Sequence, residues 1–528
     1  MQTGLLTPFL GFRGRRARGH RSMGLTLTEI LIAVTITLVL MAVLVNAFRD
    51  ISGQISESRA IIQLAGQLRS GAEQIREDLR GVTLPVTPWV NPAEGLGYFE
   101  QAEFDIAVDV PNPPVDDPNF AFLFDNVLGD VDDVLMFTCR SPGSPFRGRV
   151  RLADGSLITI ESPLAEIVIW TRLLDENGNG TLDRNLGEVI TVHRRTLLIR
   201  PDLNDDINVF PTVGQVAGNN NLLNWYQNND LSVHVSETGL VANSLGDLSK
   251  REYRFGHAVA SDANFTSGNI ADIDASLFPY PINRNWLNAL TLQGNFFGED
   301  VLLSDVVTFD VKLFDPNAPV YDDAIYRQGG FAQSAIVPGD PTFETLILAD
   351  AQDGSLNGMI DLGTYVDAGY MFNAATTAGA PVLLGASYFS GLPQPKSQMG
   401  LDTITLPTFS RYGYDTWPNH YESDGLNQDA AFSVYGGNHF DVDISKQAVG
   451  TLVDEGTNGF DEPHDGRDFS GNPDALLGQQ INGADDAAER ETSPPYPVPL
   501  RGIEIRIRLV EPTSQQVRQT SIAVDFEN

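Results

Sequence analysis

Residues 25–45 read LTLTEILIAVTITLVLMAVLV, an apolar run of 21 residues that a single charge, Glu29, interrupts. At 1.5 Å per residue, a helix of this length spans roughly 31 Å, about the thickness of the hydrocarbon core of a bilayer. The 24 residues before the run contain no acidic side chain but five arginines, which are Arg13, Arg15, Arg16, Arg18 and Arg21. The basic flank predicts a membrane helix whose N-terminal side faces the cytoplasm.

Three kinds of targeting segment combine a basic flank with an apolar run. A cleaved secretory signal has a shorter apolar region, about 7–15 residues, and a small-residue cleavage site after it. Ala42, Asn46 and Ala47 fit such a site poorly. A plain signal anchor explains the length but gives Glu29 no role, although an unpaired carboxylate in lipid costs roughly 2.5 kcal/mol or more. The third kind is a prepilin, whose leader is cut before the apolar run.

The sequence MGLTLTE at residues 23–29 resembles the processing site of type IV prepilins and of the pseudopilins of type II secretion. The resemblance implies that prepilin peptidase cuts after Gly24, that Leu25 becomes the N-methylated first residue, and that Glu29 is the glutamate at the fifth mature position. Leu25 stands where Phe or Met is usual, and Thr28 replaces an aliphatic residue.

Cleavage after Gly24 would create a positive amine at Leu25, four residues before the Glu29 carboxylate. Residues four apart are neighbours on one helix, so the two groups could pair within a chain. In an assembly, the amine of an incoming subunit could instead neutralise Glu29 of its neighbour. Because an unpaired charge in lipid is expensive, this pairing would draw the subunit out of the membrane and set its axial register.

An amphipathic continuation of the helix is predicted over residues 47–82, because apolar residues step mostly by three or four. These are Ile51, Ile55, Ile62, Ala65, Leu68, Ala72, Ile75 and Leu79. Thr83, Leu84 and Pro85 predict its end. The alternative is a separate helix lying on the membrane, although the polar face has mixed charge and is not rich in lysine.

The chain beyond Pro85 has the composition of a β-rich protein, with short alternating runs between turns and 49 Gly and 31 Pro in the whole sequence. Strands are predicted at 156–160, 165–174, 189–200, 305–314 and, less clearly, 409–414. At the C-terminus, residues 501–509 alternate isoleucines with charged residues, and 517–526 return after a polar turn. This pattern predicts an antiparallel hairpin with one solvated side.

The sequences LRGIEIRIRL (500–509) and VRQTSIAVDF (517–526) resemble the C-terminus of J-type minor pseudopilins, and AEIVIWTRLL (165–174) with HRRTLLIR (193–200) resembles their central hairpin. The resemblance implies an α+β fold, in which a long N-terminal helix packs on an antiparallel β-rich domain. The expected order is a cleaved leader (1–24), a transmembrane helix (25–46), its continuation (47–82), the first part of a pilin-like domain (83–200), a loop-rich insertion of unclear fold (201–499) and a hairpin closing the pilin-like sheet (500–528).

Composition narrows the classes of partner. The formal charge is −35, and removal of the five leader arginines leaves 29 basic against 69 acidic side chains, or −40. Nucleic-acid binding needs a clustered basic face, so no nucleic-acid contact is predicted. The single cysteine, Cys139, excludes an intrachain disulfide and lies in an apolar strand-like run, where it is expected to be a small buried hydrophobe.

Two acidic loops are candidate Ca²⁺ sites. Residues 175–183 read DENGNGTLD and place oxygen ligands at alternate positions: Asp175, Asn177, Asn179, the Thr181 carbonyl and Asp183. An EF-hand also needs Glu at position twelve, where Leu186 stands. The same sequence fits a plain Asn-Gly hairpin turn between two strands. Residues 454–468, DEGTNGFDEPHDGRD, are richer in oxygens but less regular, and a solvated loop is the alternative there.

Motifs of enzymes are scarce: the chain holds no G-x-S-x-G, P-loop, H-E-x-x-H or dinucleotide fingerprint, so no enzymatic activity is expected. His420, His439 and His464 share the inserted region with many carboxylates, but no spacing marks a zinc or catalytic site. The sequence predicts a single-pass inner-membrane subunit of a pseudopilus or pilus, with its globular part periplasmic or extracellular. Expected partners are prepilin peptidase, other minor and major pseudopilins or pilins, and secreted cargo. The alternatives are a surface binding module on a prepilin-type anchor and, third, a hydrolase on that anchor.

Overall fold

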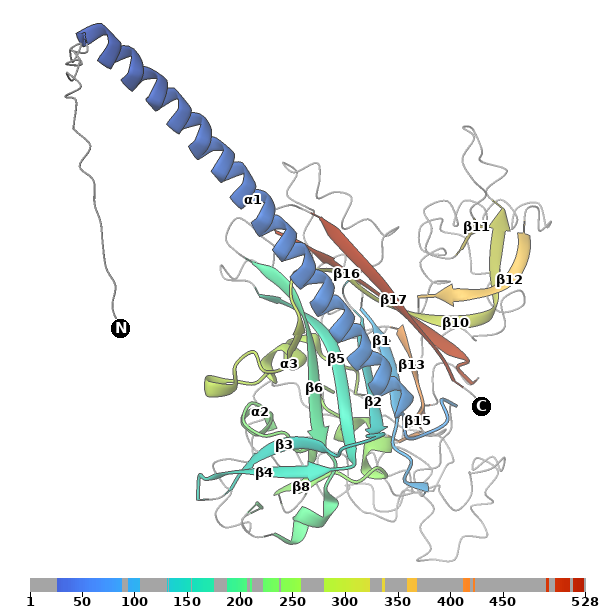
Figure 1. Ribbon diagram of the computed structural model, residues 1–528. Helices are drawn as coiled ribbons and strands as arrows, with labels where there is room; N and C mark the ends of the chain where they lie inside the picture. The colour runs from blue at the N-terminus through green and yellow to red at the C-terminus, as the bar shows by residue number, and fades with distance from the viewer. Residues whose placement is uncertain are drawn as a thin grey trace, which may run out of the picture. The chain divides into compact units, whose positions relative to one another are not determined.

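The computed structural model describes residues 26–87, 94–104, 131, 133–152, 154–174, 188–206, 209–210, 222–236, 239–257, 280–322, 335–337, 359–367, 412–417, 421–422, 491–492, 499–512 and 516–526. It is mixed helix and sheet, with a long N-terminal helix and antiparallel sheets (Figure 1). The chain divides into two compact units, Met1–Ile62 and Gln63–Asn528. The second is called the β-rich unit below.

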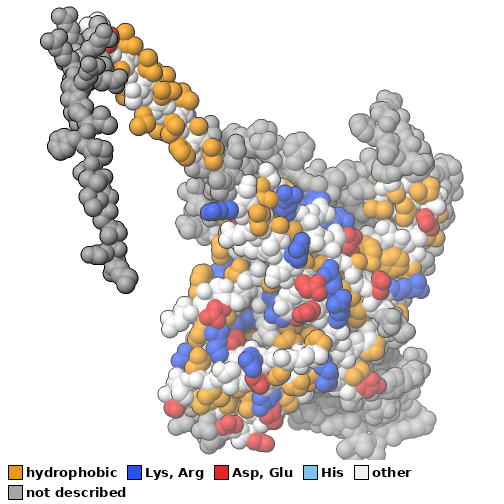
Figure 2. Space-filling model, viewed as in Figure 1, with side chains coloured by type: hydrophobic (Ala, Val, Ile, Leu, Met, Phe, Trp, Pro, Cys, Tyr) orange, Lys and Arg blue, Asp and Glu red, His pale blue; other side chains and the backbone are white. Residues whose placement is uncertain are grey.

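The N-terminal unit contains the first part of helix α1 (Leu27–Arg80). Residues Leu27–Arg49 have a mean hydropathy of 2.7, and none of them is buried. Apolar side chains cover the visible surface of this segment (Figure 2). Within the described residues, this is the one helix long and apolar enough to cross a membrane. Helix α1 continues without a break past residue 47, as predicted for the amphipathic continuation.

The last part of α1 belongs to the β-rich unit, where its apolar face is buried in the main core. The buried positions step by three or four and are Leu64, Leu68, Ala72, Ile75 and Leu79. Ile62 and Ala65, which the periodicity assigned to the same face, are exposed, and Leu64 is buried instead. Gly71 lets the helix approach a strand closely, since an added Cβ would lie 2.8 Å from Leu303 Cδ2.

The C-terminal end of α1 is fixed by an ion pair. Asp78 is buried, and its two carboxylate oxygens accept hydrogen bonds from Arg194 Nε at 2.6 Å and Nη2 at 2.8 Å. The Gly81 N–H then bonds to the Asp78 carbonyl at 2.9 Å, immediately after the helix ends at Arg80. Because this guanidinium–carboxylate pair is bidentate, it fixes the orientation of the last helical turn relative to the strand that carries Arg194.

The first sheet has six strands in the order β13-β1-β2-β5-β6-β9, and every neighbouring pair is antiparallel. The strands are β13 (Tyr412–Asp415), β1 (Phe99–Glu103), β2 (Val134–Arg140), β5 (Leu164–Leu174), β6 (Val189–Leu198) and β9 (Val301–Leu303). Strand β5 is buried on both faces: Ile167 and Ile169 belong to the core that contains α1, whereas Val168 and Trp170 belong to a second core. Burial on both faces explains why its sequence is a continuous apolar run.

The second sheet has the path β11-β10-β16-β17, and β12 also pairs with β10. The strands are β10 (Val306–Asp322), β11 (Ala335–Ile336), β12 (Met359–Val366), β16 (Gly502–Val510) and β17 (Val517–Asp525). The predicted C-terminal hairpin is confirmed as β16 and β17, with Ile503, Ile505 and Ile507 buried. Its position differs from the expectation, because β16 pairs with β10 in this separate sheet and does not close the sheet built from residues 83–200.

Asp133 connects the two sheets. Its carboxylate accepts the Val311 N–H of β10 at 2.6 Å and a Gln101 Nε2 hydrogen bond from β1 at 2.7 Å. Segment 201–499, which the sequence set apart as an insertion, supplies β9, β10 and β13 to these two sheets. Its strands are thus interleaved with those of the flanking segments.

Smaller elements surround the second core. Three two-stranded antiparallel sheets complete the described strands: β3 (Phe146–Arg151) with β4 (Leu157–Ser162), β7 (Val233–Ser236) with β8 (Gly239–Ala242), and β14 (Tyr421–Glu422) with β15 (Glu491–Thr492). The short helices are α2 (Leu222–Tyr226) and α3 (Arg284–Ala289), with 3-10 turns at Pro201–Asp205, Asp247–Ser249, Arg251–Tyr253 and Gly294–Phe296. Tyr226, Trp286, Phe255 and Trp170 contribute aromatic side chains to this core.

Candidate functional site

The first turn of α1 holds Glu29 through a capping box. The Glu29 carboxylate accepts the Thr26 N–H at 2.8 Å and the Thr26 hydroxyl at 2.9 Å, and the Thr26 Oγ1 in turn accepts the Glu29 N–H at 3.3 Å. The spacing T-x-x-E is the sequence signature of this motif. A carboxylate there also suits the positive end of the helix dipole. Glu29 therefore has a local structural role at the helix start, besides the role in assembly that the resemblance implies.

Glu29 is exposed at the beginning of the apolar segment Leu27–Arg49. The only other charged residue of this span is Arg49 at its far end, so the Glu29 carboxylate attracts and pairs with a cation that approaches the start of the helix. The pairing energy rises steeply when the surroundings change from water to lipid or protein, because the dielectric constant falls.

Both candidate calcium loops lie outside the described residues, because residues 175–187 and 454–468 are not among them. The flanking strands of the first loop are described: β5 and β6 pair antiparallel, with Leu174 opposite Val189. The loop thus joins the two strands of a hairpin. Among the residues that the structure describes, no group of three or more His, Cys, Asp or Glu side chains is placed to hold a metal ion.

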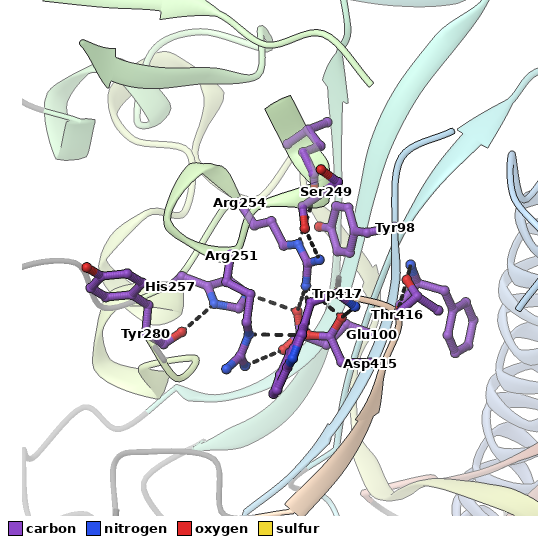
Figure 3. Close-up of polar contacts among 12 residues, drawn as sticks. Tyr98, Glu100, Ser249, Arg251, Arg254, His257, Tyr280, Asp415, Thr416 and Trp417 are labelled. Carbon is purple, nitrogen blue, oxygen red and sulfur yellow. Dashed lines mark hydrogen bonds and ion pairs between the residues drawn. The ribbon is translucent and has the colours of Figure 1, made fainter. Parts of the chain in front are cut away.

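A buried ionic cluster, which the sequence analysis did not identify, lies in the β-rich unit (Figure 3). We use "ionic cluster" for Glu100, Arg251, Arg254, His257 and Asp415, all at most 4 % exposed. Arg254 Nη1 bonds to Glu100 at 2.8 Å and to Asp415 at 2.7 Å, and Arg251 Nη2 bonds to Glu100 at 2.8 Å. The cluster joins β1, β13 and the 251–257 segment. These segments are far apart in sequence.

The opposite charges of the ionic cluster offset the desolvation energy that their burial costs. Burial raises the pKa of Glu100, but His257, Arg251 and Arg254 together hold it well below its ordinary value. Burial also lowers the pKa of His257, which the Glu100 charge opposes. His257 faces two acceptors, the Tyr280 carbonyl at 2.6 Å and Glu100 Oε2 at 2.9 Å. Both acceptors are satisfied only when the ring carries two protons.

Aromatic rings cover both guanidinium groups of the ionic cluster. The Arg251 Cζ atom lies 4.4 Å from the ring centroid of Trp417, and the Arg254 Cζ atom lies 4.0 Å from that of Tyr98. Cation–π contact and bidentate pairing are the interactions that favour Arg over Lys at such positions. The charged groups of the cluster are directed at one another, and they hold three chain segments together.

A hydroxyl, an imidazole and a carboxylate also lie in a row, from Thr191 and His193 of β6 to Asp300 directly before β9. Thr191 Oγ1 lies 3.0 Å from His193 Nε2, and His193 Nδ1 lies 3.5 Å from Asp300 Oδ1. This order is that of a nucleophile, a general base and an orienting acid. Thr191 and His193 are each only 2 % exposed, and the Thr191 hydroxyl donates to the Arg172 carbonyl at 3.2 Å. The hydroxyl is thus enclosed and engaged, so the arrangement supports packing and carries no argument for catalysis.

Of the residues that the sequence analysis assigned to sites, Glu29 is the one whose surroundings the structure describes. Gly24, Leu25, Asp175, Asn177, Asn179, Thr181 and Asp183 lie outside the described residues. No protein-family model, curated protein or solved structure matches this chain. The ionic cluster had no signal in the sequence, because Glu100 and Asp415 each lie more than 150 positions from the arginines that they contact.

Proposed function

We propose that this protein is a minor pseudopilin or minor pilin, anchored in the inner membrane by α1 and assembled through that helix into a pseudopilus or type IV pilus-like filament. The observation that carries the proposal is the exposed apolar segment Leu27–Arg49 with Glu29 in its first turn. The continuation of the same helix into the core of an antiparallel β-rich unit supports it. The C-terminal hairpin that resembles J-type subunits favours a position at the filament tip.

The mechanism is assembly and involves no chemical step at the filament. Prepilin peptidase removes residues 1–24 and the new amine of Leu25 is methylated, with the N-terminus cytoplasmic and the β-rich unit periplasmic. The positive amine of an incoming subunit then pairs with Glu29 of its neighbour inside the bundle of apolar helices. Pairing removes the cost of an isolated carboxylate in lipid, and only one axial register brings the two charges together.

Processing is tested by mass spectrometry of the protein purified from membranes. The mature chain is expected to begin with N-methylated Leu25, because Gly24 and Glu29 are spaced as the peptidase requires. An intact leader, or a mature chain that begins after Val45, would contradict the prepilin proposal. Replacement of Gly24 by a bulky residue, Gly24→Leu, serves as the control and is expected to retain the leader.

Assembly is tested with two substitutions at Glu29. Glu29→Gln keeps a side chain that can accept the capping hydrogen bonds but removes the charge, whereas Glu29→Ala removes both. We expect both variants to insert in the membrane and both to lose incorporation into filaments by about tenfold or more, since a lost buried charge pair costs several kcal/mol. The measurement is the ratio of protein in sheared filament fractions to protein in membranes. Normal incorporation of Glu29→Gln would show that Glu29 only caps the helix and would overturn the proposed role.

A surface binding module on the same anchor makes a different prediction. It would be retained in membranes without co-purifying with other minor pseudopilins or pilins. Crosslinking followed by affinity purification of the full-length chain is expected to recover such subunits in wild type and to lose them in Glu29→Gln.

A further inference from the structure

A small pocket lies in the β-rich unit between α2, α3, β7 and the Arg251–Tyr253 turn. Leu222, Tyr226, His234, Glu252, Trp286 and Leu290 are among the residues that line it. The cavity volume is about 20 Å³, enough for one water-sized group, so only the head of a longer ligand would lie inside it. We refer to it as the Glu252 pocket.

Glu252 is the unusual member of this lining. It is 6 % exposed, and no other residue donates a hydrogen bond to either carboxylate oxygen. Glu166, an equally buried carboxylate nearby in the same core, shows how such a group is normally satisfied. It accepts hydrogen bonds from Tyr98 Oη at 2.8 Å, Ser232 Oγ at 2.6 Å and the Phe255 N–H at 3.0 Å. A buried carboxylate without donors is rare, because its desolvation is not compensated.

The neighbouring cations do not supply the missing donors. Arg254 directs Nη1 to Glu100 and Asp415, Nε to the Leu248 carbonyl at 3.0 Å and Nη2 to the Ser249 carbonyl at 3.0 Å. Arg251 directs Nη2 to Glu100 at 2.8 Å, and the Lys250 Nζ atom lies over the Tyr253 ring, 5.6 Å from its centroid. His257 directs Nδ1 to the Tyr280 carbonyl and Nε2 to Glu100. His234 Nδ1 is 2.6 Å from Asn243 Oδ1, and the ring stacks on Tyr253. Glu252 is thus left as the acceptor available to a molecule entering from outside.

We propose that the Glu252 pocket binds a primary alkylammonium group, with the Glu252 carboxylate accepting its N–H bonds. An ammonium has the size of the open space and offers three donors to a site that has two free acceptor oxygens. Tyr226 and Trp286 provide ring surface for a cation, and Leu222 and Leu290 provide apolar surface for its methylene groups. A metal ion is a poorer match, since a single carboxylate is available and the neighbouring imidazoles are engaged.

The electrostatic setting gives the site a pH dependence. Burial raises the pKa of Glu252 to about 7, and the charges of Lys250, Arg254 and Arg251 oppose the rise. Burial lowers the pKa of His234, which also lines the pocket, as it does that of His257. Between about pH 5.5 and pH 8.5 an alkylamine and the arginines stay charged, whereas Glu252, with a pKa of about 7, becomes charged. Affinity for the ammonium is expected to rise with it.

The test uses the full-length chain in detergent micelles and isothermal titration calorimetry. The probes are n-butylammonium chloride, neutral n-butanol of the same chain length, and N-acetyl-lysine amide, which presents the ammonium as a polypeptide would. We expect n-butylammonium to bind wild type at about pH 8.5 and to bind at least about tenfold more weakly at pH 5.5, as loss of a charge-assisted pair predicts. At pH 8.5, n-butanol is expected to bind more weakly than n-butylammonium, because it carries no charge to pair with Glu252. A stronger response to N-acetyl-lysine amide than to n-butylammonium would assign the ligand to a lysine side chain, and the reverse to a free amine.

Two variants make the test specific. Glu252→Gln preserves shape and is expected to abolish the pH dependence and to weaken n-butylammonium binding at least about tenfold. Glu77→Gln removes the same charge from an exposed position on α1 and is expected to bind as wild type does. Equal affinity of wild type and Glu252→Gln, or equal binding of n-butanol and n-butylammonium, would overturn the proposal. The wild-type pH comparison does not require any variant to fold, and the outcome is independent of filament assembly.

Discussion

Arg254→Ala is expected to destabilise the β-rich unit by about 3–5 kcal/mol, because it removes one of the two arginines that the buried carboxylates Glu100 and Asp415 share, leaving Arg251 alone to pair with both. Arg254 is 4 % exposed and uses all its N–H groups inside the protein. Loss of one member of a buried pair costs more than the pair contributes, since the remaining charge keeps its desolvation penalty. The measurement is urea unfolding of the detergent-solubilised full-length chain, followed by the fluorescence of buried tryptophans such as Trp170 and Trp417.

An exposed ion pair provides the matched control for Arg254. Arg200 and Asp202 form a bidentate pair with side-chain exposures of 27 % and 61 %. Arg200→Ala is expected to change the free energy of unfolding by about 1 kcal/mol or less, because solvent already screens the two charges. Similar losses in Arg254→Ala and Arg200→Ala would show that the ionic cluster does not hold the unit together. Arg254→Lys should recover only part of the stability, because an ammonium cannot reproduce the fork of guanidinium hydrogen bonds.

Ile75→Ala is expected to cost about 2–5 kcal/mol, because it opens a cavity where α1 packs in the main core. The Ile75 side chain is fully enclosed, with 0 % exposure, and lies in one cluster with residues of both sheets. Urea unfolding is again the measurement, and a loss of stability should appear as a lower midpoint with an unchanged slope.

Ile62→Ala is the control for Ile75→Ala within the same helix. Ile62 is 72 % exposed, so its truncation removes little buried surface and should change the unfolding midpoint only slightly. Equal effects at the two positions would mean that the substitutions act through helix propensity and not through packing.

The parts of the fold that the sequence predicted are those where local pattern and burial agree. Residues 25–45 form an apolar run too long for an ordinary core helix, and the structure has α1 from Leu27. The isoleucines at 503, 505 and 507 alternate with charged residues, and β16 buries them while the charged side chains lie on the other face. In both cases a single short window contains the whole signal.

Tertiary packing decided what the sequence missed. The predicted stripe reached Ile62 and Ala65 by steps of three residues, and each such step falls about 60° short of a full turn, so Ile62 lies about 120° away from Leu68. Leu64 is four residues before Leu68 and stays within about 40° of it, on the buried face. The strand order could not be predicted for another reason: β10 and β16 pair across nearly 200 positions, and the pairing places Phe309, Val311 and Leu313 beside the isoleucines of β16 in one core. The ionic cluster and the Glu252 pocket depend on contacts between residues that no local window contains.

The interleaved strands have a consequence for how the chain reaches its native state. The helix face with Leu64, Leu68 and Ile75 is covered by a core whose members include Phe309 of β10 and Ile505 of β16, more than 230 and 400 positions later. Contacts of such long range form slowly, because long loops must close before any contact stabilises them. The main core can therefore be completed only after nearly the whole chain has been synthesised. Until then, part of the apolar surface of this core stays exposed, and such transiently exposed surface favours aggregation.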